Sequence, residues 1–263
     1  SEQQERVLKV HLKKKRGQHV LVDQNIINKL SKNISPNKED LIIEIGAGDG
    51  ALTKSILPYI KSMCLIEKDK DLINGLDFIL KKNKSSKVIN QDVLELDFSI
   101  FEYPYRVIGN LPYNISTEII FKVCKIENVI DMHFMLQKEV VERIVSKPNT
   151  KVYGRLSVMA QAYFIPKKLF DISENVFIPK PKVKSSFLRL LPRKSIFKNN
   201  KHEEIFYNIV KSSFEGRRKM IRQSLSKYLN EDDYDNVNID PKLRAENLTV
   251  NDYLRISKYV YQI

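Results

Sequence analysis

The sequence predicts an α/β protein with a doubly wound parallel sheet and a small, all-helical C-terminal domain. Over roughly the first 125 residues, short apolar strands alternate with helical patterns. The strands are apolar throughout, which is typical of parallel strands covered by helices on both faces. After Pro192 the pattern becomes helical without strands. A chain of 263 residues that is 42% hydrophobic can bury such a core, and we expect domains at residues 1–193 and 194–263.

Each element follows from its local pattern. Strands are predicted at residues 40–45, 62–66, 87–90, 106–109, 132–136 and 185–191. Helices are predicted between them at residues 51–57, 71–82, 116–124 and 137–146, and Pro58 limits the first of these. The C-terminal domain is predicted to contain helices at residues 203–229 and 251–261.

The composition excludes several classes of protein. No apolar run approaches the roughly 20 residues of a membrane span, and residues 1–16 lack the apolar core of a secretory signal. Cys64 and Cys124 lie in apolar runs, as reduced core cysteines do. No Cys/His cluster has the spacing of a metal site. We therefore expect a cytoplasmic protein with no metal and no membrane partner.

The net charge of +13 is concentrated in three stretches. Residues 1–16 hold six basic residues against two glutamates, residues 175–202 hold eight and no acid, and residues 211–227 hold six against Glu215. Residues 39–77, by contrast, hold eight acidic residues and four lysines. This segregation favours a groove for nucleic acid over scattered solvated charges.

A glycine loop and two carboxylates follow three successive predicted strands. Gly46, Gly48 and Gly50 follow the first strand and open a helix, where glycine permits tight turns and close approach of a ligand. Glu67 ends the second strand, where a carboxylate can bind both ribose hydroxyls, and Asp92 follows the third, where it can accept from an adenine amine. This ordered set predicts a Rossmann-like site for an adenosine-containing ligand.

The tetrapeptide Asn110-Leu111-Pro112-Tyr113 follows the fourth strand. Pro112 keeps Leu111 out of the helical region, which can direct the Leu111 carbonyl into the cleft. That carbonyl and the Asn110 amide oxygen could accept both hydrogens of an exocyclic amine, and Tyr113 could stack on the base. Methyl transfer from a sulfonium needs mainly this positioning, because the sulfur loses its charge during the reaction.

These motifs resemble the rRNA adenine N6,N6-dimethyltransferases, which use S-adenosylmethionine. The resemblance covers nearly the whole chain. It rests on residues 18–21 (QHVL), 44–50 (EIGAGDG), 110–117 (NLPYNIST), 135–145 (MLQKEVVERIV), 153–161 (YGRLSVMAQ) and 177–186 (FIPKPKVKSS). Residues 217–225 (RRKMIRQSL) and 239–247 (IDPKLRAEN) are similar to the bacterial KsgA-type enzymes. These modify two adjacent adenosines in the 3′-terminal hairpin of small-subunit (16S) rRNA.

The resemblance implies specific site residues. Target-adenine contacts are expected at Asn110, Leu111, Pro112 and Tyr113, with Phe177 closing on the other face of the base. Cofactor contacts are expected at Gln18, His19, Leu21, Glu44, Gly46, Ala47, Gly48, Gly50, Glu67, Lys68, Asp92, Val93 and Asn110. His19 departs from the family, which usually has Asn there, although imidazole can also hydrogen-bond.

Two basic segments are expected to bind RNA. Lys180, Lys182 and Lys184 alternate in an extended stretch beside Phe177. Residues 214–225 are predicted to form a helix with Arg218 and Arg222 on one face, flanked by Arg217 and Lys219, as a clamp for phosphates. The expected partner is small-subunit rRNA or the immature small subunit, bound by a monomer that acts in subunit biogenesis.

Two alternatives remain at this point. A large-subunit rRNA methylase of the macrolide-resistance type would share the fold and the tetrapeptide, although residues 217–247 argue against it. The second alternative is a non-catalytic ribosome-assembly or transcription factor on the same fold. The intact set of Glu67, Asp92 and Asn110–Tyr113 disfavours this second alternative.

Overall fold

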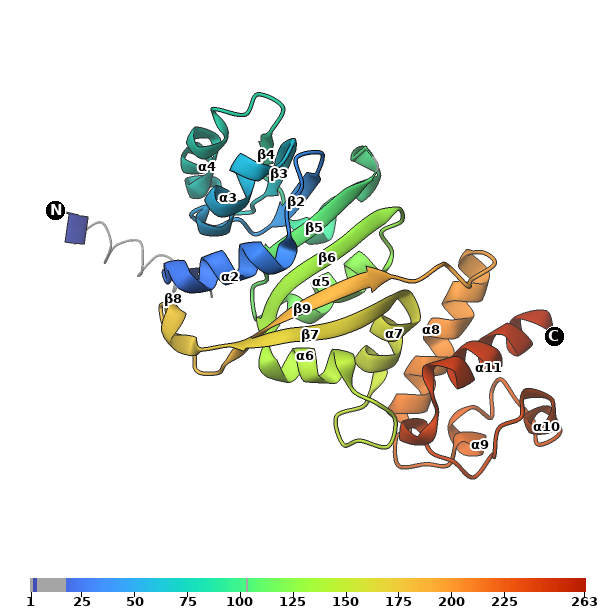
Figure 1. Cartoon of the computed structure of the whole chain (residues 1–263). Helices are drawn as coiled ribbons and strands as arrows, with labels where there is room; N and C mark the ends of the chain where they lie inside the picture. The colour runs from blue at the N-terminus through green and yellow to red at the C-terminus, as the bar shows by residue number, and fades with distance from the viewer. Residues whose placement is uncertain (1, 4–17, 103) are drawn as a thin grey trace. The chain divides into compact units, whose positions relative to one another are not determined.

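The computed structural model describes residues 2–3, 18–102 and 104–263 (Figure 1). The chain forms two compact units, Ser1–Val141 with Lys167–Leu191, and Glu142–Pro166 with Pro192–Ile263. The second unit therefore includes residues 142–166, which we expected in the N-terminal domain. Within the described ranges, no helix is both long and apolar enough to cross a membrane.

The first unit is built on a seven-stranded sheet of order β4-β3-β2-β5-β6-β9-β7. Its strands are β2 (Leu41–Ile45), β3 (Ser62–Ile66), β4 (Lys87–Ile89), β5 (Tyr105–Asn110), β6 (Val129–Gln137), β7 (Phe164–Ile172) and β9 (Ser185–Pro192). The pairs β2–β3, β3–β4, β2–β5 and β5–β6 are parallel, whereas β9 pairs antiparallel with β6. The predicted doubly wound α/β sheet is thus confirmed, with β7 as a strand that we did not predict.

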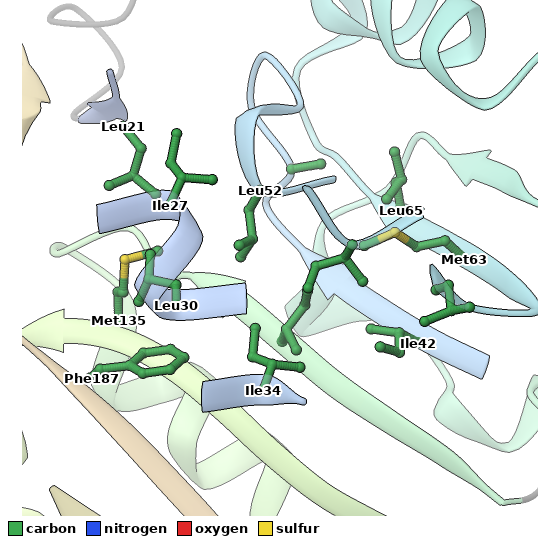
Figure 2. Close-up of a cluster of buried hydrophobic side chains, with 14 of the residues drawn as sticks. Leu21, Ile27, Leu30, Ile34, Ile42, Leu52, Met63, Leu65, Met135 and Phe187 are labelled. Atoms are coloured by element: carbon green, nitrogen blue, oxygen red, sulfur yellow. The ribbon is translucent and has the colours of Figure 1, made fainter. Parts of the chain in front are cut away.

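One face of this sheet is covered by α2 (Gln24–Ile34), α3 (Ala51–Ile56) and α4 (Ile73–Leu80). Leu30 and Ile34 of α2 pack with Ile42 of β2 and Phe187 of β9 in one buried cluster (Figure 2). Helix α2 was not predicted from the sequence, although the Asp23 side chain caps it by accepting from the Ile26 amide at 3.0 Å.

The opposite face is also buried. Because side chains alternate along a strand, Ile43 of β2, Val107 of β5 and Phe134 of β6 point away from the α2 cluster, and all three are fully buried. The helix α5 (Ser116–Cys124) lies behind the sheet in Figure 1 and buries Ile119 and Val123. Helices on both faces leave the strand ends as the accessible edges of the sheet.

The second unit is mainly helical. Its helices are α7 (Arg155–Tyr163), α8 (Asn200–Glu215), α9 (Ile221–Ser224), α10 (Asp233–Val237) and α11 (Val250–Gln262), and α6 (Lys138–Val145) joins the two units along the chain. Phe206 and Ile209 of α8 and Ile256 of α11 are fully buried. The buried phenol of Tyr153 donates to the Leu248 carbonyl at 2.7 Å, which ties the loop before α7 to this core.

The predicted helix over residues 203–229 is wrong in its C-terminal half. Helix α8 ends at Glu215, with Gly216 as its cap, and the chain then turns. Met220 is extended and forms a β-bridge with Arg244, so α9 is a separate short helix. Arg218 and Arg222 therefore do not share one helical face, because a tertiary contact of Met220 overrides the local helical pattern.

Candidate active site

The carboxyl ends of the parallel strands bring the predicted residues to one edge of the sheet. Ile45 of β2 pairs with Ile66 of β3 on one side and with Gly109 of β5 on the other. Gly46 and Glu67, which follow β2 and β3, and Asn110, the last residue of β5, are therefore neighbours. In open α/β sheets, ligands bind at this edge.

The glycine loop has a backbone conformation that other residues rarely adopt. Gly48 has φ +62°, and its amide donates to the Glu67 carboxylate at 3.0 Å. Gly50, with φ +84°, caps α3, and a Cβ atom there would lie 2.3 Å from the side chain of Ile79. Glycine is therefore required at Gly50 by both conformation and space, whereas at Gly48 the positive φ alone favours it.

Glu67 and Asp92 are held by backbone amides. Glu67 is 2% exposed and accepts from the Gly48 and Asp69 amides, each at 3.0 Å. Asp92 caps the 3-10 helix η3 (Val93–Glu95) by accepting from the Leu94 amide at 3.0 Å, and its other oxygen lies 3.3 Å from the Lys68 ammonium. A carboxylate has about four acceptor positions, so both can also accept hydrogen bonds from a ligand.

A cavity of about 550 Å³ lies beside these carboxylates. This volume is in the usual range for sites that bind small molecules and cofactors. Seven predicted residues line it, namely Gln18, Gly46, Glu67, Lys68, Asp92, Val93 and Pro112. Ile66 and Ile119 add apolar surface to this cavity. These two residues were not predicted as site residues, and neither were Gln91 and Asn114, which also line it. Each of the four lies within or next to a predicted strand, helix or motif.

A second, smaller cavity of about 50 Å³ shares Gln18, Gly46 and Pro112 with the first. Eleven predicted residues line it: Gln18, His19, Leu21, Glu44, Gly46, Ala47, Gly48, Asn110, Leu111, Pro112 and Tyr113. The structure thus gathers the N-terminal motif, the glycine loop and the tetrapeptide around one small space. Val20, Asp49, Ala51 and Leu52 also line it and lie inside or next to the same motifs.

The N-terminal motif is attached to the site by two kinds of contact. Strand β1 (Val20–Leu21) pairs antiparallel with β8 (Phe177–Ile178). The His19 carbonyl accepts from the Asn110 side-chain nitrogen at 2.9 Å. Because a carbonyl only accepts, this bond fixes which end of the Asn110 amide is the donor and leaves its oxygen as the acceptor for a ligand.

Burial shifts the pKa of two groups here. Burial raises the pKa of Glu44 to about 8, against the opposing effect of a 2.5 Å hydrogen bond from the Thr53 hydroxyl, and the nearby charges of Glu67 and Asp49 raise it further. Burial also raises the pKa of the Tyr113 phenol. The raised pKa favours the neutral carboxyl of Glu44 at pH 7, whereas Tyr113 is a neutral phenol at this pH with or without the shift.

Gly50 and Phe177 are the two predicted cofactor or adenine contacts that line neither cavity. Gly50 acts as the helix cap described above. Phe177 is 2% exposed, pairs with Leu21 and belongs to the buried cluster under α2. Its burial reflects the tertiary pairing of β1 with β8, which residue spacing does not reveal.

The basic residues fall into different environments. Lys180, Lys182 and Lys184 are exposed in the turn after β8, and Arg218, Lys219 and Arg222 are exposed between α8 and α9 or within α9. Arg217 instead donates to the carbonyls of Tyr153 at 2.9 Å and Lys151 at 3.0 Å, and lies 3.4 Å from the Glu246 carboxylate. Its side chain thus holds the loop before α7. The predicted basic stretch at residues 1–16, apart from residues 2–3, lies outside the described residues.

The chain is similar to proteins of known class over almost its whole length. The family model described as "Ribosomal RNA adenine dimethylase" matches residues 9–262. A protein named ribosomal RNA small subunit methyltransferase A from Nitrosospira multiformis is 41% identical, over 94% of this chain and 95% of that protein. A protein of the same name from Francisella tularensis subsp. novicida is 43% identical, over 96% and 98%.

Solved structures share the fold. A dimethyladenosine transferase from Plasmodium falciparum has a TM-score of 0.79 at 23% identity, over 90% of this chain and 96% of that one. The 23S rRNA methyltransferase ErmE has a TM-score of 0.70 at 22% identity, over 92% and 99%. The match to a family of methyltransferases favours an enzyme over the non-catalytic alternative. The chain belongs to the ribosomal RNA adenine dimethylase family, enzymes whose methyl donor is S-adenosylmethionine.

Proposed function

We propose that this enzyme dimethylates N6 of two adjacent adenosines in the 3′-terminal hairpin of small-subunit rRNA, and that it acts during small-subunit biogenesis as a cytoplasmic monomer. Its main support is the identity of 41–43%, over at least 94% of the chain, to proteins named small subunit methyltransferase A. The charge supports a partner with many phosphates, because the basic stretches are separate from the acidic segment that contains the glycine loop.

The larger cavity suits the adenosine part of the cofactor. Glu67 would accept from the ribose hydroxyls and Asp92 from the adenine amine, while Ile66 and Ile119 supply apolar walls. Gln18, His19, Leu21 and Glu44 would bind the amino-acid part. The cofactor supplies a methyl group on a positively charged sulfur. The carboxyl groups of Glu67 and Asp92, which line the larger cavity, suit a cationic ligand.

The tetrapeptide would hold the target amine. The Asn110 side-chain oxygen and the Leu111 carbonyl would accept its two hydrogens and so aim the nitrogen lone pair along the cavity. Asn110 is preorganised for this role by its bond to the His19 carbonyl, and the Leu111 amide is occupied by the Met135 carbonyl at 3.1 Å. Tyr113 would stack on the base. Such positioning can contribute much of the rate acceleration.

The exposed lysines after β8 would contact phosphates near the base pocket. In the second unit, Arg218, Lys219 and Arg222 would contact other phosphates of the RNA, with Arg217 acting to hold the local backbone. Phe177 would support the β1 segment through its pairing with Leu21.

Methyl transfer from labelled S-adenosylmethionine to unmethylated small subunits, with the modified nucleotides mapped, tests this proposal. We expect dimethyladenosine at two adjacent positions near the 3′ end. A clear preference for naked large-subunit RNA would overturn it in favour of the large-subunit alternative; the 23S rRNA methyltransferase ErmE has a fold similar to that of this chain.

A further inference from the structure

We propose that Ser185 is a positioning residue that fixes the Tyr113 ring before the target adenine arrives. The inference deepens the proposed function, on which it rests, because Tyr113 is there the surface on which the base stacks. Ser185 is not among the residues to which the sequence assigned a role.

The contact that carries the inference joins two residues far apart in the chain. The Tyr113 hydroxyl and the Ser185 hydroxyl form a hydrogen bond across a sequence separation of 72 residues. Ser185 is fully buried, and Tyr113 is only partly exposed. The bond is therefore shielded from competing water, so losing it costs more than losing a surface contact would.

The two partners differ in rigidity. Ser185 begins β9 and pairs with Gln137 at the end of β6, and the neighbouring Lys184 carbonyl accepts from the Lys138 amide at 3.0 Å. Tyr113 lies in the turn between β5 and α5. A hydroxyl fixed by the sheet thus holds a side chain on a turn, which is how a binding geometry is made precise.

A second contact limits the ring from the side. The His19 ring lies 5.0 Å from the Tyr113 ring, centroid to centroid, at an interplanar angle of 33°. His19 itself is held by a 2.8 Å hydrogen bond between its Nδ1 atom and the Pro179 carbonyl, so Nδ1 is the donor. The phenol is therefore held at its hydroxyl by Ser185 and beside its ring by the N-terminal motif.

A preformed stacking surface makes a specific kinetic prediction. A mobile ring would still allow the base to enter but would leave the amine less well aimed, and alignment matters more to the rate than to binding. The loss should be largest in the second transfer, because the methylated amine has one hydrogen fewer with which to hold its own orientation.

The test uses the full-length enzyme, unmethylated small subunits, and the variants Ser185→Ala, Tyr113→Phe and their combination. Each single variant should lower the single-turnover rate by roughly threefold to tenfold, the range that corresponds to one buried hydrogen bond. Both should accumulate monomethyladenosine, with KM changed by less than about twofold. The double variant should be no slower than Tyr113→Phe, because both changes remove the same bond.

The adjacent Ser186 provides a matched control. It is also a fully buried serine of β9, but its hydroxyl donates to Asp171 at 2.7 Å. Ser186→Ala should keep the wild-type rate and ratio of products, and Ser185→Thr should restore much of what Ser185→Ala loses. A wild-type rate in Tyr113→Phe, or additive losses in the double variant, would overturn the proposal.

A measurement without substrate separates this inference from the proposed function. With 3-fluorotyrosine incorporated at position 113, the fluorine resonance should move towards that of free fluorotyrosine in Ser185→Ala but not in Ser186→Ala. An unmoved resonance would contradict the positioning role even if the enzyme methylates small subunits. A moved resonance with no methylation by the wild type would instead count against the proposed function alone.

Discussion

Glu67 connects the glycine loop to the larger cavity. Its carboxylate accepts from the Gly48 amide within the loop and from the Asp69 amide after its own strand, and the residue also lines the larger cavity. The same side chain therefore shapes the loop and faces the ligand, so its removal should affect cofactor binding before anything else.

Glu67→Ala should weaken cofactor affinity by roughly tenfold to a hundredfold, the usual effect of losing hydrogen bonds to a charged group. RNA affinity should change little, because the exposed basic residues of the chain are untouched. Titration calorimetry with S-adenosylhomocysteine and a filter-binding assay with RNA measure the two affinities. Equal losses of both would contradict the assignment of Glu67 to the cofactor.

Glu44 should make the stability of the cofactor-free enzyme depend on pH. Its pKa is about 8 in the folded chain and near 4.5 when unfolded, so between these values the folded state holds a proton that the unfolded state has lost. The stability that the proton on Glu44 gives to the folded state is therefore fully present below pH 4.5 and is lost as pH rises through 8. The loss should be on the order of a few kcal/mol.

Urea unfolding at several pH values checks this expectation, with Glu44→Gln as the reference. Gln is always neutral and can still accept from Thr53, so the difference in unfolding free energy between wild type and variant should shift against the wild type as pH rises from 5 to 8. A constant difference over that range would mean that Glu44 is already ionised.

At the scale of elements, a buried arginine joins α2 to the sheet. Arg106 of β5 is 7% exposed and donates to Asp131 at 2.8 and 3.1 Å, to Asp40 at 2.8 Å and to the Ser35 carbonyl at 3.2 Å. It also donates to the Ile34 carbonyl, at the last residue of α2. These bonds satisfy carbonyls at the end of α2 that the helix itself leaves without partners.

Arg106→Met should destabilise the first unit by about 3 kcal/mol or more, because it leaves two largely buried carboxylates without their cation. Equilibrium unfolding in urea measures the change. Lys168→Met is the control, since its ion pair with Asp171 at 3.2 Å is about one-third exposed, and such a pair contributes less than about 1 kcal/mol. Equal effects of the two variants would show that burial adds nothing to the Arg106 network.

Element prediction succeeded where one local signal dominated. The apolar strands β2, β3 and β5 and the helix α5 lie where their patterns indicate. Helix α2 was missed although Ile27, Leu30 and Ile34 follow helical spacing, because its several Asn residues are weak helix formers. Strand β7 was missed because most of its residues are only partly buried or exposed, so it lacks the apolar run of the parallel strands.

At the scale of the whole molecule, the charge distribution should control binding to RNA. Arg218→Glu with Arg222→Glu should weaken RNA or subunit binding and flatten its dependence on salt. Each lost phosphate contact should reduce the slope of log K against log salt concentration by about 0.7 to 0.9. Lys81→Glu with Lys82→Glu, which replaces two exposed lysines after α4, is the control with an equal change of charge.

Binding measured from about 50 to 200 mM salt distinguishes the outcomes. An unchanged slope in the arginine double variant would exclude contacts between these arginines and phosphates. A slope equally reduced by the lysine control would mean that total charge, and not these positions, governs binding.

The division of the chain into two units also shows what local sequence patterns fail to predict. A change from strands to helices marks the border at Leu191 and Pro192, close to the expected boundary after residue 193. Residues 142–166, however, group with the C-terminal helices through contacts such as that of Tyr153 with Leu248, 95 residues away. Distant partners of this kind leave no periodic signal in a single sequence.

The sequence alone was sufficient for the α/β class, the strand-end residues Gly46, Glu67, Asp92 and Asn110, and the family. Each of these depends on local spacing, and the parallel order of strands then brings the strand ends together. The fold was needed to reveal the Ser185–Tyr113 bond, the orientation of the Asn110 amide, the burial of Phe177 and the structural bonds of Arg217. These are contacts between residues distant in the chain, and their existence depends on how the elements pack, which residue order does not state.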